Sequence, residues 1–359
     1  MKQLLTIPLA LLFIAPVFSQ TKKEQKQKLK QQKAFVKEQP FVYIPTGSVV
    51  HGSSDQDVPW QGQTRSRVVS IDSFYMQEGE VTNFEYLEFV RSIKKTDTTL
   101  AKTLLPDTLV WRSSTMQNEP YVEYYLRHPA YNDYPVVGVS YNQVIAYAEW
   151  KTEQYNALPE EERIYKKVKF RLPTEEEWEY AARGGLNYSI YPWGGPYMQN
   201  SKGMHMANML YVSQSSVYRD TVWVKNFRHA IDSTQPEFIP KLQYLSAGPS
   251  YYMGVAGNLN DNADITAPVI SYWPNGYGLY NMAGNVEEMV DAYYNREDNL
   301  YEFSHSERKK SEDPSGVTRG GSWHDTGYYG MVTTRQFYEG RDYASGEMGF
   351  RLVMDVVEY

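Results

Sequence analysis

The chain has 359 residues and no cysteine, an absence that limits both its folding and its chemistry. No disulfide bond can hold its loops together, whatever the redox state of its compartment. From about Tyr188 onward, long polar segments lack regular periodicity but contain many tryptophan, tyrosine and methionine residues. Such segments need order imposed by side-chain packing or by bound metal. We therefore expect a domain that is rich in loops.

The first 40 residues are expected to lie outside that domain. Lys2 precedes an apolar run from Leu4 to Phe18, which predicts a secretory signal peptide over residues 1–19. The run is too short for a transmembrane helix, so the protein is not expected to be integral to a membrane. Residues 20–40 are rich in lysine and glutamine, which predicts a disordered tail. Without a cysteine, the chain cannot carry the lipid anchor of a bacterial lipoprotein.

Charge is unevenly distributed along the chain. The formal net charge is −7, yet the tail is basic, so the negative charge is concentrated in residues 41–359. An acidic body argues against nucleic acid as a partner. The basic tail is interpreted as a solubilising spacer.

Helix and strand signals occur in separate segments, which favours an α+β domain. A strand is expected at Phe41–Pro45, and strand-like fragments follow at Thr221–Val224 and Gly349–Met354. Three short helices are expected, because each begins with a capping box that can satisfy free backbone N–H groups. The capping boxes are Thr82 with Glu85, Ser140 with Gln143, and Thr174 with Glu177.

Six sequence blocks, in order, resemble the formylglycine-generating enzyme (sulfatase-modifying factor) family. They are Gly79–Asn83, Phe170–Gly185, Tyr191–Gly194, Asn275–Met289, Arg319–Trp323 and Gly349–Arg351. The resemblance implies one α+β domain over residues 41–359, with C-type-lectin-like topology and little regular secondary structure.

A branch of that family is also indicated. Leu105–Arg112, Asn118–Tyr131 and Tyr134–Ser140 resemble the gliding-motility lipoprotein J of Bacteroidetes and its type IX secretion relative K. This resemblance implies a periplasmic scaffold of the gliding or type IX secretion apparatus, with the outer membrane as one place of association. It also implies protein partners in that machinery, and a homo- or hetero-oligomer stays open.

The resemblance places two catalytic thiols shortly after the Arg-Gly-Gly-Ser-aromatic motif. Asp325 and Gly330 stand at those positions. Neither residue can bind copper as a thiolate or act as a thiol nucleophile. The sequence therefore predicts a pseudoenzyme, with no catalytic residues and no activity.

Two structural calcium ions are predicted from the same resemblance, because Ca²⁺ takes side-chain and backbone oxygens from loops. The first set comprises the side chains of Asn281 and Glu288 with the carbonyls of Gly284 and Val286. The second set comprises the side chains of Asn208 and Asp261 with the carbonyls of Met209 and Ala263. The alternative is that these side chains only cap loops through hydrogen bonds.

Two other functions stay open. A glycan or peptide could bind in the cleft that corresponds to the active site of the family, which would require an exposed aromatic and acidic groove near Trp323 and Asp325. Alternatively, His324 and Asp325 could support a thiol-independent metal chemistry. Four tryptophans in the motif blocks are expected to pack in the core, and three arginines are expected to pair with buried carboxylates. They are Trp178, Trp193, Trp273, Trp323, Arg171, Arg335 and Arg351.

Overall fold

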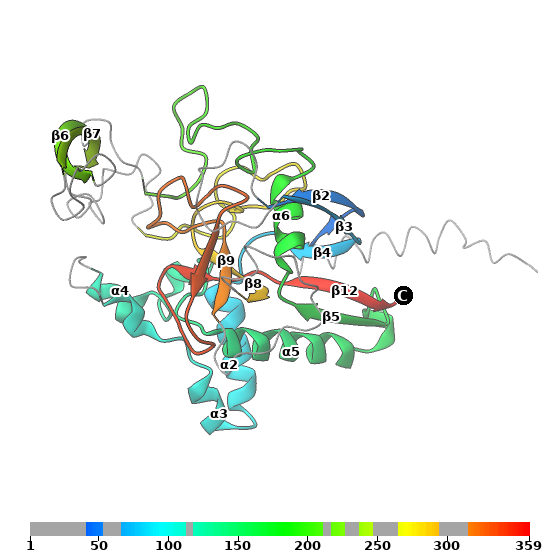
Figure 1. The fold of residues 1–359 in the computed structure, drawn as a ribbon. Helices are drawn as coiled ribbons and strands as arrows, with labels where there is room; N and C mark the ends of the chain where they lie inside the picture. Colours follow the sequence, from blue (N-terminus) through cyan, green and yellow to red (C-terminus); the bar gives the residue numbers. More distant parts are fainter. Residues whose placement is uncertain are drawn as a thin grey trace, which may run out of the picture. The chain divides into compact units, whose positions relative to one another are not determined.

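The computed structural model describes residues 41–52, 66–112, 118–210, 217–226, 237–246, 265–293 and 315–359 (Figure 1). Pro40–Tyr359 forms one contact unit. The predicted signal peptide and tail lie outside the described residues. No helix among the described residues is long and apolar enough to cross a membrane.

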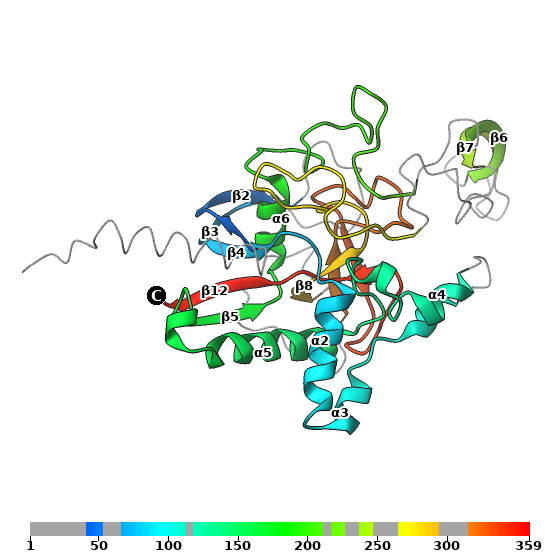
Figure 2. The same ribbon diagram turned by 180° about the vertical axis from the view of Figure 1, so that it is seen from behind.

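The first sheet joins the two ends of the domain. Its strand order is β1 (Phe41–Ile44), β4 (Phe74–Gln77), β12 (Val353–Glu358) and β5 (Lys167–Arg171), with every neighbouring pair antiparallel. The predicted strand at the start of the domain is thus confirmed as β1. The long helix α5 (Tyr141–Ala157) packs against β5 (Figure 2).

The second sheet carries the candidate site at its end. Its order is β10 (Arg335–Tyr338), β9 (Gly316–Arg319), β8 (Glu287–Tyr293) and β11 (Met348–Gly349), and only the β11–β8 pair is parallel in this sheet.

Two antiparallel hairpins complete the strands of the described residues. They are β2 (Gly47–His51) with β3 (Arg67–Ile71), and β6 (Val217–Asn226) with β7 (Glu237–Ser246). The predicted strand fragment at Thr221–Val224 lies within β6.

All three predicted capping boxes are confirmed, at the starts of α2 (Asn83–Lys94), α5 and α6 (Glu175–Arg183). The prediction that all three helices are short is wrong for α5, which has 17 residues. Buried side chains recur along α5 from Val144 to Tyr155, so packing extends it. The other helical segments are α3 (Thr98–Thr103), α4 (Glu119–Tyr124), η1 (Thr108–Trp111), η2 (Pro129–Tyr131) and η3 (Glu160–Glu162).

The predicted strand over Gly349–Met354 is divided. β11 ends at Gly349 and β12 begins at Val353, and the three residues between them, Phe350, Arg351 and Leu352, are all fully buried. In a strand with one solvated face, buried and exposed side chains would alternate. This segment instead connects the two sheets through the core of the domain. The backbone nitrogens of Val81 and Gln77 donate to its carbonyls.

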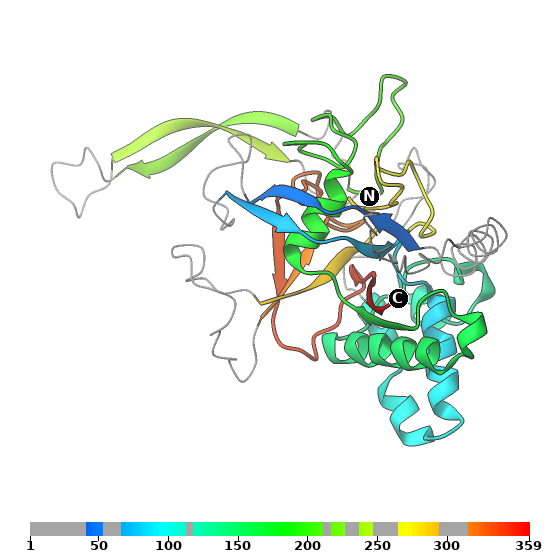
Figure 3. The same cartoon turned by 90° about the vertical axis from the view of Figure 1, so that its right-hand side faces the viewer.

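Helix α6 organises the core beside the β2–β3 hairpin (Figure 3). Trp178 is fully buried, as predicted, and the guanidinium of Arg319 lies 5.4 Å from its ring centroid. Arg319 donates to Glu175 at 2.9 Å and to Glu179 at 2.8 Å. Burial acts to raise the pKa of Glu179, but the hydrogen bond with His51 and the nearby arginine charges outweigh it and lower the pKa to about 2. Glu179 is therefore ionised, and it balances Arg319 inside the core.

The predicted pairing of the other three arginines is also confirmed. Arg171 contacts Glu177 at 2.7 Å and Asp355 at 2.6 Å. Arg335 lies 2.6 Å from Glu175. Arg351 pairs with Glu288.

Replacing Arg319 by Met should lower the free energy of unfolding by about 3–5 kcal/mol, because two buried carboxylates would each lose one of their cationic partners. Chemical denaturation measures this change. Arg112→Met is the matched control, since Arg112 and Glu119 form an exposed pair, and it should cost less than about 1 kcal/mol. Equal losses in the two variants would contradict a structural role for the buried pair.

Candidate functional site

The site loop, defined as Gly320–Thr334, carries both positions predicted to replace the thiols. Arg319 holds the two ends of this loop together: it precedes Gly320 and donates to the carbonyls of Val332 at 2.7 Å and Thr333 at 3.3 Å. Gly321 has a φ of +68°, and a Cβ there would lie 2.9 Å from the carbonyl carbon of Tyr329. Glycine is therefore needed for the loop to fold back on itself.

Asp325 is held by the loop itself. Its Oδ2 accepts hydrogen bonds from the Ser322 backbone nitrogen at 2.9 Å, the Ser322 hydroxyl at 2.7 Å and Gln336 Nε2 at 3.2 Å. Its carbonyl accepts from Leu210 at 2.8 Å. The first thiol position is thus occupied by an oriented carboxylate that binds the turn.

Gly330 lies against a packed methionine. A Cβ at Gly330 would meet the Met209 sulfur at 2.6 Å and its methyl carbon at 3.0 Å. Met209 is buried in a small apolar cluster with Ala207 and Ala283. The second thiol position is therefore filled by the Met209 side chain.

His324 does not pair with the adjacent Asp325 but with the carboxylate of Glu347. His324 and Asp325 lie in a turn, not in a strand. His324 Nδ1 is 2.8 Å from Glu347 Oε1, and this hydrogen bond, against the effect of burial, raises the pKa of His324. The pair is about two-thirds buried on each side, so the imidazole is positioned by a carboxylate, as in general-base sites.

Glu287 completes what we call the acidic site, namely His324, Asp325, Glu287 and Glu347. Burial and, to a smaller extent, the charges of Asp325 and Glu347 raise the pKa of Glu287 to about 7, against the hydrogen bond from Thr318. Asp325 and Glu347 thus lie close enough to Glu287 to repel its charge, and Glu287 titrates near neutrality. Within the described ranges, no three histidine, aspartate or glutamate side chains are arranged to hold a metal ion.

The predicted tryptophan placements hold in part. Trp323 is buried beside Trp111, with ring centroids 6.1 Å apart, and its indole donates to Gly346. Trp323 is therefore a core residue, as predicted, and its ring does not offer an aromatic face to a ligand in the cleft. Trp273, predicted to be core, is 46% exposed, because it lies in a loop without a regular element on either side.

The first predicted calcium set does not fit a cation in this arrangement. Both carboxylate oxygens of Glu288 accept from the Arg351 guanidinium, and Oε2 also accepts from Trp178 at 2.8 Å. Asn281 instead donates to Glu80 at 3.2 Å and to the Val269 carbonyl at 3.1 Å. A calcium ion at Glu288 would lie against a buried guanidinium, so the alternative of loop capping describes these side chains.

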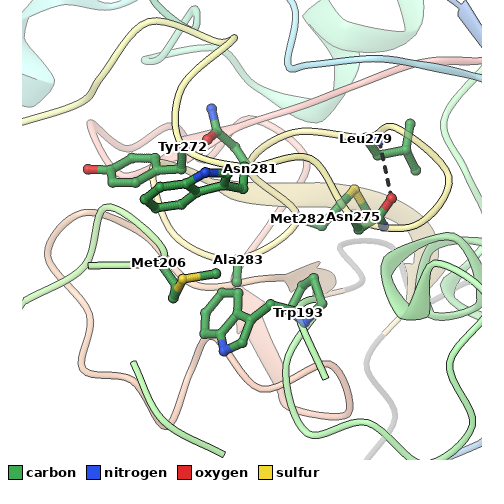
Figure 4. A pocket seen from close by; sticks show the side chains of 10 residues that line it. Trp193, Met206, Tyr272, Asn275, Leu279, Asn281, Met282 and Ala283 are labelled. Atoms are coloured by element: carbon green, nitrogen blue, oxygen red, sulfur yellow. Dashed lines mark hydrogen bonds between the residues drawn. The ribbon is translucent and has the colours of Figure 1, made fainter. Parts of the chain in front are cut away.

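The loop that carries this set is nevertheless tightly built. Gly284 has a φ of +78°, and a Cβ there would lie 2.4 Å from the Asn208 carbonyl. Val286 is fully buried in the core. Figure 4 shows Asn281 in a small pocket with Tyr272, Trp193 and Met206.

The second calcium set is only partly described. Asn208 is buried and donates to the Ile265 carbonyl at 2.7 Å. Met209 follows it and packs against Gly330. Asp261 and Ala263 lie outside the described residues. Calcium at this set stays a prediction.

Several important residues gave no clear signal in the sequence. Asn285, fully buried, donates to Glu80 at 2.9 Å and accepts from the Ala267 backbone at 2.7 Å. Burial raises the pKa of Glu80 to about 8.

The alternation of side chains along β8 could have indicated that Glu287 and Glu288 face different environments, since neighbours on a strand face opposite sides. Nothing local pointed to Glu347.

Residues 25–356 match the family model of the sulfatase-modifying factor enzyme 1-like domain. The chain belongs to this family. Bovine formylglycine-generating enzyme is 28% identical over 88% of this chain and 74% of its own length. The enzyme of that name from Thermomonospora curvata is 27% identical, over 79% and 82%. A bovine relative named inactive C-alpha-formylglycine-generating enzyme 2 is 27% identical, over 87% and 86%.

Solved structures support the family fold, with mixed helices and strands. PvdO from Pseudomonas aeruginosa superimposes with a TM-score of 0.55 and 19% identity, covering 88% of this chain and 94% of its own. Treponema denticola variable protein 1 gives a TM-score of 0.50 and 18% identity, covering 87% and 94%. At these identities the likeness concerns the fold alone.

One prediction requires correction. The sequence predicted that the chain is not an enzyme, but the similar proteins include several named formylglycine-generating enzymes. Missing thiols exclude only thiol chemistry. The acidic site retains a positioned histidine and a carboxylate that titrates near pH 7, so the inference from absent cysteines to absent activity was wrong.

Replacing Asp325 by Asn should lower the pKa of Glu287 by up to about 1 unit, because a neighbouring negative charge is removed while the Ser322 contacts keep an acceptor. Carboxyl-selective ¹³C NMR titration measures this pKa. Asp342→Asn, at an exposed carboxylate, is the control and should leave it unchanged. An unchanged pKa of Glu287 in Asp325→Asn would contradict the coupling.

The second calcium set predicts ion-dependent stability. Calcium at about 100 times Kd, added after chelation, should raise Tm by roughly 5 °C. Asp261→Asn should remove this increase, and Asp342→Asn should retain it. If neither the chelator nor calcium changes the Tm of the wild-type chain, this site is ruled out.

Proposed function

We propose that the chain is a structural protein of a gliding-motility or type IX secretion apparatus that binds partner proteins through its acidic site. The branch-specific segments Leu105–Arg112, Asn118–Tyr131 and Tyr134–Ser140 support this placement, as does the predicted export signal. In this proposal the protein lies in the periplasm without a lipid anchor. Its topology is C-type-lectin-like, and calcium at the Asn208 set has a structural role.

One observation carries the binding proposal: a carboxylate and a packed methionine occupy the two thiol positions. Asp325 is fixed by Ser322, and Asp325 and Glu347 lie near enough to Glu287 for their charges to raise its pKa. A fixed cluster of carboxylates at a partly exposed loop is complementary to lysine and arginine side chains. The partner segment we expect is therefore a basic peptide stretch.

A second candidate function is a thiol-independent reaction. The 2.8 Å contact between His324 Nδ1 and Glu347 favours it, because a carboxylate at Nδ1 orients the ring and raises the basicity of Nε2. His324 would then take a proton from a bound substrate through Nε2. Loss of turnover in His324→Gln, with partner binding retained, would distinguish this function from the first.

Deletion of the gene in its native host should abolish gliding and secretion through the apparatus. The wild-type gene should restore both, whereas the double variant Asp325→Ala, Glu347→Ala should fail to do so because it removes two charges of the proposed binding surface. Spreading on agar and the amount of secreted cargo are the measurements.

The matched control changes two carboxylates elsewhere. Glu160→Ala, Glu161→Ala removes the same charge from the exposed segment η3, and it should restore gliding and secretion fully. Thermal melting of the purified variants verifies that each is folded. A deletion strain that glides and secretes normally would refute the proposal.

A further inference from the structure

A second cavity lies between strand β2 and the C-terminal end of α6, and it contains no residue of the acidic site. Its volume is about 180 Å³. Three tyrosines, an arginine and an asparagine line it together with residues of β2. They are Tyr180, Tyr188, Tyr277, Arg183 and Asn187. This combination of aromatic faces with a few polar groups is typical of small-molecule sites.

The polar side of the cavity is formed by the guanidinium of Arg183, which is ion-paired. Arg183 is 5% exposed and pairs with Glu179 at 2.7 Å, a carboxylate that it shares with Arg319. Its Nη1 donates to the Ser189 carbonyl. Its Nη2 donates to the Val50 carbonyl at 3.4 Å as well as to Glu179. These bonds fix the guanidinium at the wall of the cavity.

The aromatic side is shaped by the loop that follows α6. Tyr180 and Tyr277 pack with ring centroids 5.9 Å apart. Gly184 and Gly185 have φ angles of +58° and +84° and turn the chain back. Tyr188 has a φ of +56° and is 61% exposed at the edge of the cavity. A left-handed conformation is unfavourable for tyrosine, and residues held in this way cluster at ligand sites.

We propose that this cavity binds a neutral sugar ring, such as a hexose or an N-acetylhexosamine at the end of a glycan. A sugar offers an apolar face to tyrosine rings and hydroxyl groups to Arg183 and Asn187. An anion beside Arg183 would also lie near the Glu179 carboxylate, which is 2.7 Å from the guanidinium, and this repulsion disfavours it. The volume corresponds to about six water molecules at ~30 Å³ each, which suits one ring and not an extended chain. This site is independent of the partner-binding function proposed above.

Saturation-transfer difference NMR with the full chain tests the proposal. The probes are glucose, galactose, mannose and N-acetylglucosamine, with glucuronic acid as the anionic counterpart. We expect transfer to at least one neutral sugar and none to glucuronic acid. Tyr188→Ala should weaken binding by about tenfold, the equivalent of one lost aromatic contact.

The matched control is Tyr124→Ala, which removes a tyrosine that is 53% exposed on α4 and does not line the cavity. It should leave the signal unchanged, and thermal melting verifies that both variants are folded. Three results would overturn the proposal. They are no transfer to any neutral sugar, stronger transfer to glucuronic acid, and equal transfer in Tyr188→Ala and the wild type.

Discussion

The structure depends on one buried arginine. Arg319 ends strand β9, donates to Glu175 and Glu179 of α6, and donates to the carbonyls of Val332 and Thr333 at the far end of the site loop. It therefore closes a loop of irregular backbone that no ladder of strand hydrogen bonds supports. In a chain without disulfides, this charged contact supplies the restraint that a covalent link supplies elsewhere.

Because the loop is held at its base, the side chains along it can change without loss of the fold. The carboxylate of Asp325 accepts a hydrogen bond from the Ser322 hydroxyl within the turn, and Met209 fills the space beside Gly330. Relatives named formylglycine-generating enzyme and a relative named as inactive match this chain over similar lengths. The family fold thus constrains the framework, and the chemistry depends on the side chains at the loop.

Local rules predicted the framework well and the site only in part. The capping boxes and the arginine pairs followed from short-range patterns and from the cost of leaving charge buried. Glu347 and Met209 reach the site from segments distant in the chain, so no local pattern indicated them. Glu288 was assigned to calcium because its sequence context fits, but Arg351, 63 residues away, takes its carboxylate. Long-range competition for a charged side chain cannot be read from spacing.

The most direct test of the account is photo-crosslinking from the site loop in the native host. A benzophenone amino acid replaces Tyr329, which is 37% exposed in the loop that carries Asp325, or Leu158, which is 40% exposed elsewhere. The account predicts an adduct with a component of the gliding or secretion apparatus from position 329 only. An identical set of adducts from both positions, or none from position 329, would contradict it.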